Sequence, residues 1–340
     1  PLNEAMKKET KEQQGDVKFD IAWTTLGEYL DHLVRRGVSP NVASFIGATT
    51  VRVHELGYAD RPPTPEELER MKALVRQAME EGALGLGSSL IYAPAFYAKT
   101  DELVALSEVA GQHGGMYISH MRSEGNRIEQ AVDELIEIAR RGKLPAEIYH
   151  LKFGGRENWG KIDRVLKKIE DARAAGLRIT ADMYTYTAGA TGLDAAMPPW
   201  VQEGGLREWI RRLRDPATRA RVAREMRTPT DEWESLYLLA GSPDQVLLVG
   251  FKQDSLKHLT GRTLADVAAS FQEAIVDVQV DKSMRAASAE GIEAASEAVS
   301  AVIRGGVIRI GHWSVSHLIP RPQRAAIGSG ERSARISARP

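Results

Sequence analysis

The chain has 340 residues, a formal net charge of −1 and 27% charged residues, so its bulk charge does not indicate a nucleic-acid or anionic-membrane partner. It contains no cysteine, which excludes disulfides and thiolate metal ligands and fits a reducing compartment. No apolar run approaches the ~18–20 residues of a membrane span and no signal peptide is visible, so we expect a cytoplasmic protein.

The first third of the chain contains clear helix and strand signals. Residues 3–18 are polar and charged and are expected to form a surface segment or loop. Capping boxes at Thr25-Leu-Gly-Glu28 and Thr64-Pro-Glu-Glu67 predict two helix starts, the second with proline at the first helical position. The apolar run 41–46 predicts a strand between them. The glycine-interrupted run 83–89 predicts another, whose glycines allow the close packing found in a barrel.

Three later apolar runs each stop at a residue that can bind a metal or carry a proton: His120, His150 and Asp182. The intervals of 30 and 32 residues fit one strand plus one crossover helix each time. Helical periodicity fills both intervals, at 128–139 and 162–169. Consecutive parallel strands with right-handed crossovers place their carboxyl ends on one face, where β/α barrels carry their chemistry. We therefore predict that these three side chains converge.

After Asp182 the pattern loosens. Residues 184–200 are typical of a long loop over the strand ends. Residues 206–227 are rich in arginine, which favours a solvated helix face over a basic groove. Further on, the sequence predicts a strand at 245–250 and a helix from Thr263 to about Asp277.

The two histidines suggest a metal site. They occupy equivalent positions in consecutive βα units, and a cation follows each by two residues, at Arg122 and Lys152. Neutral imidazole suits Zn²⁺, and catalytic zinc usually has three protein ligands and an open position for water. Only two such ligands are visible, so we expect the third to come from elsewhere. Asp182 has three open roles: ligand, orienter of a ligand, or acceptor for backbone amides.

Several longer motifs occur in fixed order. They are Gly82-Ala-Leu-Gly-Leu86, Leu90-Ile-Tyr-Ala-Pro94, Ser119-His-Met-Arg-Ser-Glu-Gly125, His150-Leu-Lys152, Ala181-Asp-Met-Tyr184, and Pro198-Pro-Trp200 with Glu203-Gly-Gly205. Together they resemble the N-acyl-D-amino-acid deacylases, the D-aminoacylases of the amidohydrolase superfamily. The resemblance implies an α/β fold, the (β/α)8 TIM-type barrel of the metal-dependent amidohydrolases, incomplete at both ends. Residues 1–280 are expected to form the partial catalytic barrel and 281–340 an aberrant tail.

The resemblance also implies an activity and roles for particular residues. It implies a zinc-dependent hydrolase that cleaves the amide bond of N-acyl-D-amino acids to a D-amino acid and a carboxylate. His120 and His150 match the family's two zinc-binding histidines. Lys152 and Tyr184 match positions that help to hold the substrate's α-carboxylate. No oligomeric state is implied.

Other family residues have no match in this chain. The family's His-x-His on the first strand and the Cys or Glu that completes its zinc site are expected before Pro1. Its catalytic aspartate, in a Gly-Ser-Asp motif, is absent, so the catalytic residue stays unassigned. No Asp, Phe or Tyr follows Met284, which suggests a frameshift. Read one nucleotide later, the codons for Gly306–Trp313 can encode Val-Ser-Phe-Gly-Ser-Asp-Thr-Gly, a hypothesis that the nucleotide sequence tests.

Two other functions fit the same residues. One is a hydrolase of cyclic amides from the same superfamily, which ring-opening of a hydantoin or dihydropyrimidine would reveal. The other is a catalytically inactive barrel that binds a small carboxylate or serves as a structural partner. It predicts little zinc retention and no turnover. The fold alone does not decide among these functions, because barrels carry many different chemistries. The match of several motifs in fixed order favours the deacylase.

Overall fold

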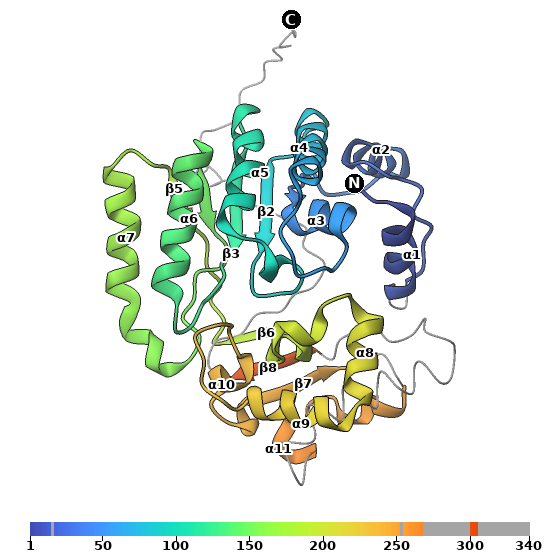
Figure 1. Cartoon of the computed structure of the whole chain (residues 1–340), viewed down its shortest axis with the longest axis vertical. Coiled ribbons are helices and arrows are strands. Elements are labelled where there is room, and N and C mark those ends of the chain that lie inside the picture. The colour runs from blue at the N-terminus through green and yellow to red at the C-terminus, as the bar shows by residue number, and fades with distance from the viewer. Residues whose placement is uncertain (15–16, 252–253, 268–299, 305–340) are drawn as a thin grey trace, which may run out of the picture.

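The computed structural model describes residues 1–14, 17–251, 254–267 and the backbone of 300–304. These residues form two units with separate hydrophobic cores, one built around a parallel sheet and the other around an antiparallel sheet. Figure 1 shows the second unit below the first, with the arrowheads of the parallel strands pointing toward it. The carboxyl ends of the parallel strands therefore face the junction between the two units.

The parallel sheet has five strands in sequential order, each parallel to the next. They are β1 (Ile46–Gly47), β2 (Gly85–Ser89), β3 (Met116–His120), β4 (Ala146–Ile148) and β5 (Ile179–Ala181). This order is that of a β/α repeat, as the spacing of the strand ends predicts. Among the described residues β1 and β5 are the edges of an open sheet, and the circle of an eight-stranded barrel is not closed.

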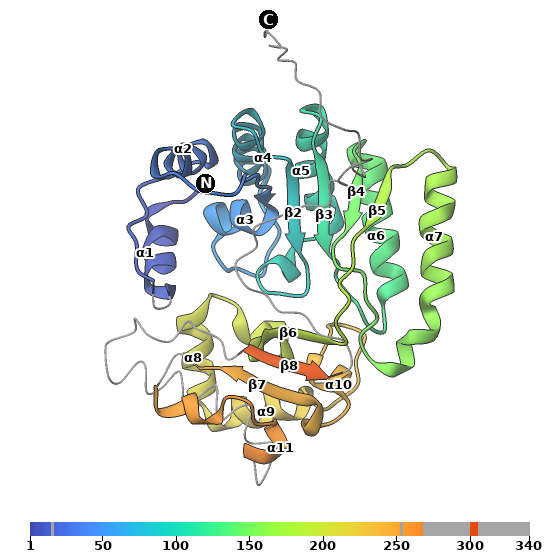
Figure 2. The same ribbon diagram turned by 180° about the vertical axis from the view of Figure 1, so that it is seen from behind.

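Helices cover one face of this sheet. They are α3 (Ala48–Leu56), α4 (Pro65–Glu80), α5 (Thr100–Gln112), α6 (Ile128–Gly142) and α7 (Ile162–Ala174), with 3-10 turns η1 (Ala95–Tyr97) and η2 (Arg156–Lys161). Helices α4, α5 and α6 lie in front of the strands in Figure 1 and behind them in Figure 2. The predicted apolar stripe of α6 is buried: Ile128, Val132, Leu135 and Ala139 are each at most 2% exposed. Helical periodicity therefore identified the buried face correctly.

One glycine of β2 is required by the neighbouring strand. Gly85 has φ of +152°, and a Cβ there would lie 1.9 Å from the carbonyl oxygen of Met116 in β3. No larger residue fits without separating the two strands. The interpretation of 83–89 as a strand with close-packing glycines is confirmed at this position.

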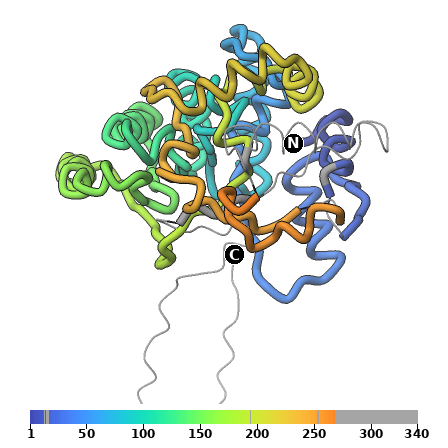
Figure 3. The backbone as a smooth tube through the Cα atoms, turned by 90° about the horizontal axis from the view of Figure 1, so that it is seen from below, coloured from blue at the N-terminus to red at the C-terminus, as the bar shows by residue number. Residues whose placement is uncertain are grey.

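The N-terminal segment is helical. Residues 3–18, expected to form a surface segment or loop, contain α1 (Glu4–Gln13), so the loop alternative is wrong, and α2 (Leu26–Arg36) follows. Asn3 caps α1 by accepting a hydrogen bond from the backbone N–H of Met6 at 2.9 Å. Ion pairs one turn apart, such as Lys7 with Glu4 at 3.0 Å, support a helix with little apolar surface. Seen from below in Figure 3, this segment lies on the side opposite α6 and α7.

Both predicted capping boxes are present, and the second allows a stability test. Thr64 Oγ1 accepts from the backbone N–H of Glu67 at 3.2 Å, and Glu67 accepts from the backbone N–H of Thr64 at 2.8 Å. Thr64→Ala should lower the free energy of unfolding by about 1 kcal/mol, because an N–H at the helix start loses its acceptor. Urea unfolding measures the loss. Thr185→Ala, at an exposed position outside any helix, is the control, and equal values for the two variants would contradict the capping role.

The second unit begins after β5. Its strands are β6 (Ala188–Gly192), β7 (Val246–Gly250) and β8 (Ser300–Arg304), antiparallel in the order β6-β8-β7. Its helices are α8 (Leu206–Arg214), α9 (Pro216–Glu225), α10 (Leu236–Ala240) and α11 (Leu264–Val267), with 3-10 turns η3 (Leu193–Ala196), η4 (Pro199–Gln202), η5 (Pro243–Gln245) and η6 (Asp254–Leu259). No helix of the described residues is both long and apolar enough to cross a bilayer.

The sequence predictions for this unit are mixed. The strand at 245–250 is confirmed, but 184–200 contains β6 and two 3-10 turns rather than one long loop. The helix predicted from Thr263 starts at Leu264, and its remainder lies outside the described residues. The division of the chain at residue 280 and the reading of 306–313 stay predictions, because nearly all of that region lies outside the described residues.

Candidate metal centre

The predicted convergence of the two histidines is confirmed. His120 is the last residue of β3, and His150 lies two residues beyond β4, which pairs with β3 in parallel. Nδ1 of His120 lies 3.1 Å from Nε2 of His150, and the rings meet edge to face at 76°. Both side chains are buried. Neighbouring strand ends therefore place two imidazoles, 30 residues apart in sequence, in direct contact.

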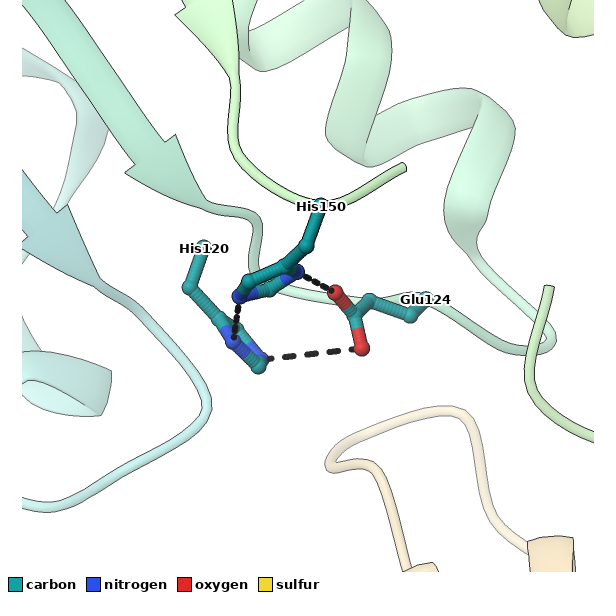
Figure 4. Close-up of side chains that lie close together, drawn as sticks. All are labelled: His120, Glu124 and His150. Atoms are coloured by element: carbon teal, nitrogen blue, oxygen red, sulfur yellow. Dashed lines mark hydrogen bonds and ion pairs between the residues drawn. The ribbon is translucent and has the colours of Figure 1, made fainter. Parts of the chain in front are cut away.

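A third residue, Glu124, completes the cluster (Figure 4). Its Oε1 lies 3.0 Å from Nδ1 of His150 and its Oε2 lies 3.8 Å from Nε2 of His120. One ligand atom from each residue can be chosen so that all lie within 4.8 Å of one another. The residue pattern had assigned Glu124 no role, and the third ligand was expected elsewhere. The available signal was a carboxylate four residues after His120, within the motif Ser119–Gly125.

Burial and charge set the protonation states of the cluster. Burial lowers the pKa of His120 to about 3, so its imidazole is neutral at neutral pH. Burial alone would raise the pKa of Glu124, but its interactions with His120, Lys152 and His150 outweigh burial and lower that pKa to about 2. The cluster therefore combines a neutral imidazole with an ionised carboxylate, the forms in which these side chains bind metals.

The structure supports one of the three roles considered for Asp182. His150 has φ of +44°, a left-handed conformation unusual for a residue other than glycine. The backbone N–H of His150 donates to Oδ1 of Asp182, and the Asp182 carbonyl accepts from the N–H of Leu151 at 2.8 Å. Asp182 is thus a backbone acceptor that holds the turn carrying His150. It is not part of the metal-ligand cluster.

Lys152 and Tyr184 lie beside the cluster. The Lys152 ammonium donates to Oε1 of Glu124 and lies 2.6 Å from Nδ1 of His150. The Tyr184 ring lies beside Lys152 and His150. Its centroid is 5.7 Å from Nζ of Lys152 and 6.4 Å from the ring centroid of His150. The Tyr184 hydroxyl is buried, and within the described part of the chain it has no hydrogen-bond partner. This leaves it able to donate to a bound ligand.

Arg122, the other cation of the sequence pattern, does not join the cluster. Its Nε and Nη2 both donate to the carboxylate of Glu134 on α6 at 2.9 Å. The guanidinium also donates to the carbonyls of Phe96 and Ala98, just before α5. Arg122 therefore joins the segment before α5 to the middle of α6, and the apparent equivalence with Lys152 was misleading.

The donor set fits a zinc-like ion. Two ligand nitrogens that share a tetrahedral zinc lie roughly 3.3 Å apart, given the usual Zn–N length. The facing nitrogens, Nδ1 of His120 and Nε2 of His150, are separated by 3.1 Å and share a hydrogen bond when no ion lies between them. The other ring nitrogen of His120, Nε2, is buried and has no hydrogen-bond partner among the residues that the structure describes. Two imidazoles and one carboxylate match the nitrogen and oxygen donors that zinc accepts.

Comparison with known proteins confirms the resemblance inferred from the motifs. No protein-family model matches the chain. It is 34% identical over 182 residues to a D-aminoacylase of Alcaligenes xylosoxydans xylosoxydans, a match covering 54% of this chain and 37% of that protein. It is also 34% identical over 151 residues to an N-acyl-D-glutamate deacylase of the same organism, covering 44% and 31%. The chain thus spans about a third of the length of these curated relatives.

Solved structures support the fold class. Crystal structures of D-aminoacylase, described as defining a novel subset of amidohydrolases and as having a binuclear metal centre, match with a TM-score of 0.59 at 25% identity. The match covers 82% of this chain and 47% of those chains. The expected fold class, the α/β barrel of the amidohydrolases, is confirmed as an open five-stranded portion.

Proposed function

We propose that this chain carries the zinc-binding part of an active site that hydrolyses the amide bond of N-acyl-D-amino acids to a D-amino acid and a carboxylate. The observation that carries the proposal is the cluster of His120, Glu124 and His150 at the carboxyl ends of consecutive parallel strands. The similarity to a D-aminoacylase supports the substrate class.

In this proposal His120, His150 and Glu124 hold the ion. When bound, zinc would lower the pKa of its water from 15.7 toward about 7 and polarise the amide carbonyl. The protein contributes burial, which limits competition by bulk water, and orientation, because Asp182 holds the turn at His150. We assign no described residue as the acid that protonates the leaving amine.

Lys152 and Tyr184 are proposed to bind the substrate's α-carboxylate. The ammonium of Lys152 and the phenol hydroxyl of Tyr184 would each donate a hydrogen bond to the carboxylate. Two such bonds from different positions would fix the carboxylate relative to the metal ligands. With the carboxylate and the acyl carbonyl both held, the two enantiomers place their side chains differently. Selectivity for the D enantiomer would follow from that difference.

The direct test is turnover by the purified 340-residue chain loaded with zinc. Amine release from N-acetyl-D-amino acids, with neutral and acidic side chains, should exceed release from the L enantiomers. Ring-opening of a hydantoin or dihydropyrimidine without amine release would favour the cyclic-amide alternative. Calorimetric binding of N-acetyl-D-amino acids without turnover would favour the inactive carboxylate-binding barrel.

The role of Tyr184 can be tested by removing a single hydroxyl. Tyr184→Phe should weaken binding of an N-acetyl-D-amino acid about 10-fold or more, because a hydrogen bond to a charged group contributes about 1.5–3 kcal/mol. Isothermal titration calorimetry or KM measures the change. The control is Tyr186→Phe, since Tyr186 is 67% exposed. Equal affinities for both variants and the unaltered protein would contradict the role of Tyr184.

A further inference from the structure

The second unit reaches the metal centre through one carboxylate. Glu234 lies between α9 and α10, yet its Oε2 contacts the loop that follows β3, about 110 residues earlier in the chain. This single oxygen accepts from Oγ of Ser123 at 2.6 Å and from the backbone N–H groups of Glu124 at 2.7 Å and Gly125 at 2.8 Å. Three donors from three consecutive residues thus converge on one acceptor.

The middle residue of this loop is Glu124, and its backbone is also held from the other side. The carbonyl of Glu124 accepts from the N–H of Gly154 at 2.7 Å, in the segment that follows His150. The backbone N–H and C=O of Glu124 are therefore both engaged, one by the second unit and one by the turn after β4. Little freedom remains for the Glu124 backbone, so its side chain starts from a defined position.

Leu239 of α10 packs against the loops that carry Gly125 and Gly154. A Cβ added to Gly125 or to Gly154 would lie 3.0 Å from a methyl carbon of Leu239. The two glycines thus allow α10 to approach the two loops that follow β3 and β4. These loops adjoin the residues of the candidate metal centre.

Packing alone does not explain an acid at position 234. An apolar side chain would fill the same space without the cost of removing a carboxylate from water. Burial and the nearby Glu124 carboxylate raise the pKa of Glu234 to about 7, so the site makes the ionised form of this acid less favourable. What the Glu234 carboxyl group supplies is one oxygen that accepts hydrogen bonds from the Ser123 hydroxyl and from the backbone N–H groups of Glu124 and Gly125, which an apolar side chain cannot do.

We propose that Glu234 is a positioning residue of the metal centre, which fixes the loop 123–125 from the second unit so that the Glu124 carboxylate points at His120 and His150. The inference rests on the proposed metal-binding role of Glu124. It assigns the second unit a part in forming the site, because the loop that carries one ligand is held by a residue outside the parallel sheet.

The test measures zinc affinity of the full chain by competition with a chromophoric chelator, together with the visible spectrum of the Co²⁺-loaded protein. Glu234→Ala should weaken zinc binding about 10–100-fold, the usual effect of losing a residue that orients a ligand. Glu234→Gln keeps an acceptor oxygen and should restore most of the affinity. Glu232→Ala removes an exposed carboxylate two residues away and should change nothing. Glu234→Met, which keeps the volume, replaces the alanine variant if that variant does not fold.

A double-mutant cycle separates positioning from general stability. If Glu234 acts through Glu124, the double variant Glu124→Ala/Glu234→Ala should bind zinc no more weakly than Glu124→Ala alone. Additive losses, or unchanged affinity in Glu234→Ala, would overturn the positioning role. Unchanged affinity in Glu124→Ala would instead overturn the ligand assignment on which the proposed function rests, so the two failures are distinguishable.

Discussion

Replacing His150 with alanine is expected to remove most of the zinc bound by this chain and any hydrolytic activity that depends on it. In the proposed site this imidazole is one of three metal donors, and catalytic zinc usually has three protein ligands, so His120 and Glu124 alone would bind the ion weakly. The lost nitrogen also leaves Lys152 free to pair with Glu124 alone, which makes that carboxylate a poorer ligand. We expect zinc affinity to fall at least about 100-fold.

Metal analysis after dialysis and chelator competition measure this loss. His258→Ala is the matched control, because His258 is an exposed histidine of η6 in the second unit. That variant should keep its zinc. If the His150 variant keeps both zinc and activity, His150 is not a ligand and the cluster has another role.

The position of this histidine is predictable from sequence because its signal is periodic. Strand and crossover helix repeat at a nearly constant length, and parallel strands end on one side of a sheet. Those two regularities are enough to bring His120 and His150 together from the residue pattern alone. The capping boxes at Thr25 and Thr64 are equally predictable, since each depends on residues three positions apart.

Glu124 was missed because its position is determined by contacts distant in sequence. It lies in a loop with no period, and the direction of its side chain depends on Glu234, about 110 residues later, and on Gly154. The role of Asp182 likewise depends on the left-handed backbone of His150, which no residue pattern indicates.

Arg122 and Lys152 show the same limit. Both lie two residues after a histidine, yet only Lys152 turns toward the cluster. The Arg122 side chain points away from the cluster because its guanidinium forms a bidentate pair with the carboxylate of Glu134 on the following helix. Equivalent positions in a repeat therefore predict the backbone direction, but the partners available on neighbouring elements decide where a long side chain lies.

Glu102→Ala is expected to be among the most destabilising single substitutions in the parallel unit. Arg52 of α3 and Glu102 of α5 form a buried pair at 2.6 Å, with side chains only 1% and 6% exposed. Arg52 also donates to the carbonyls of Ala59 and Arg61, so its guanidinium is tied to one place. Removing Glu102 leaves a buried positive charge without a counterion, which costs about 3–5 kcal/mol.

Urea unfolding of the variant measures this cost, and two further variants identify its cause. Asp171→Ala breaks the exposed Lys167–Asp171 pair and should change stability by less than about 0.5 kcal/mol, because water screens that interaction. The double variant Arg52→Met/Glu102→Leu should regain most of the stability, since an apolar pair of similar volume carries no desolvation cost. If the double variant is as unstable as Glu102→Ala, the loss comes from packing rather than from the unpaired charge.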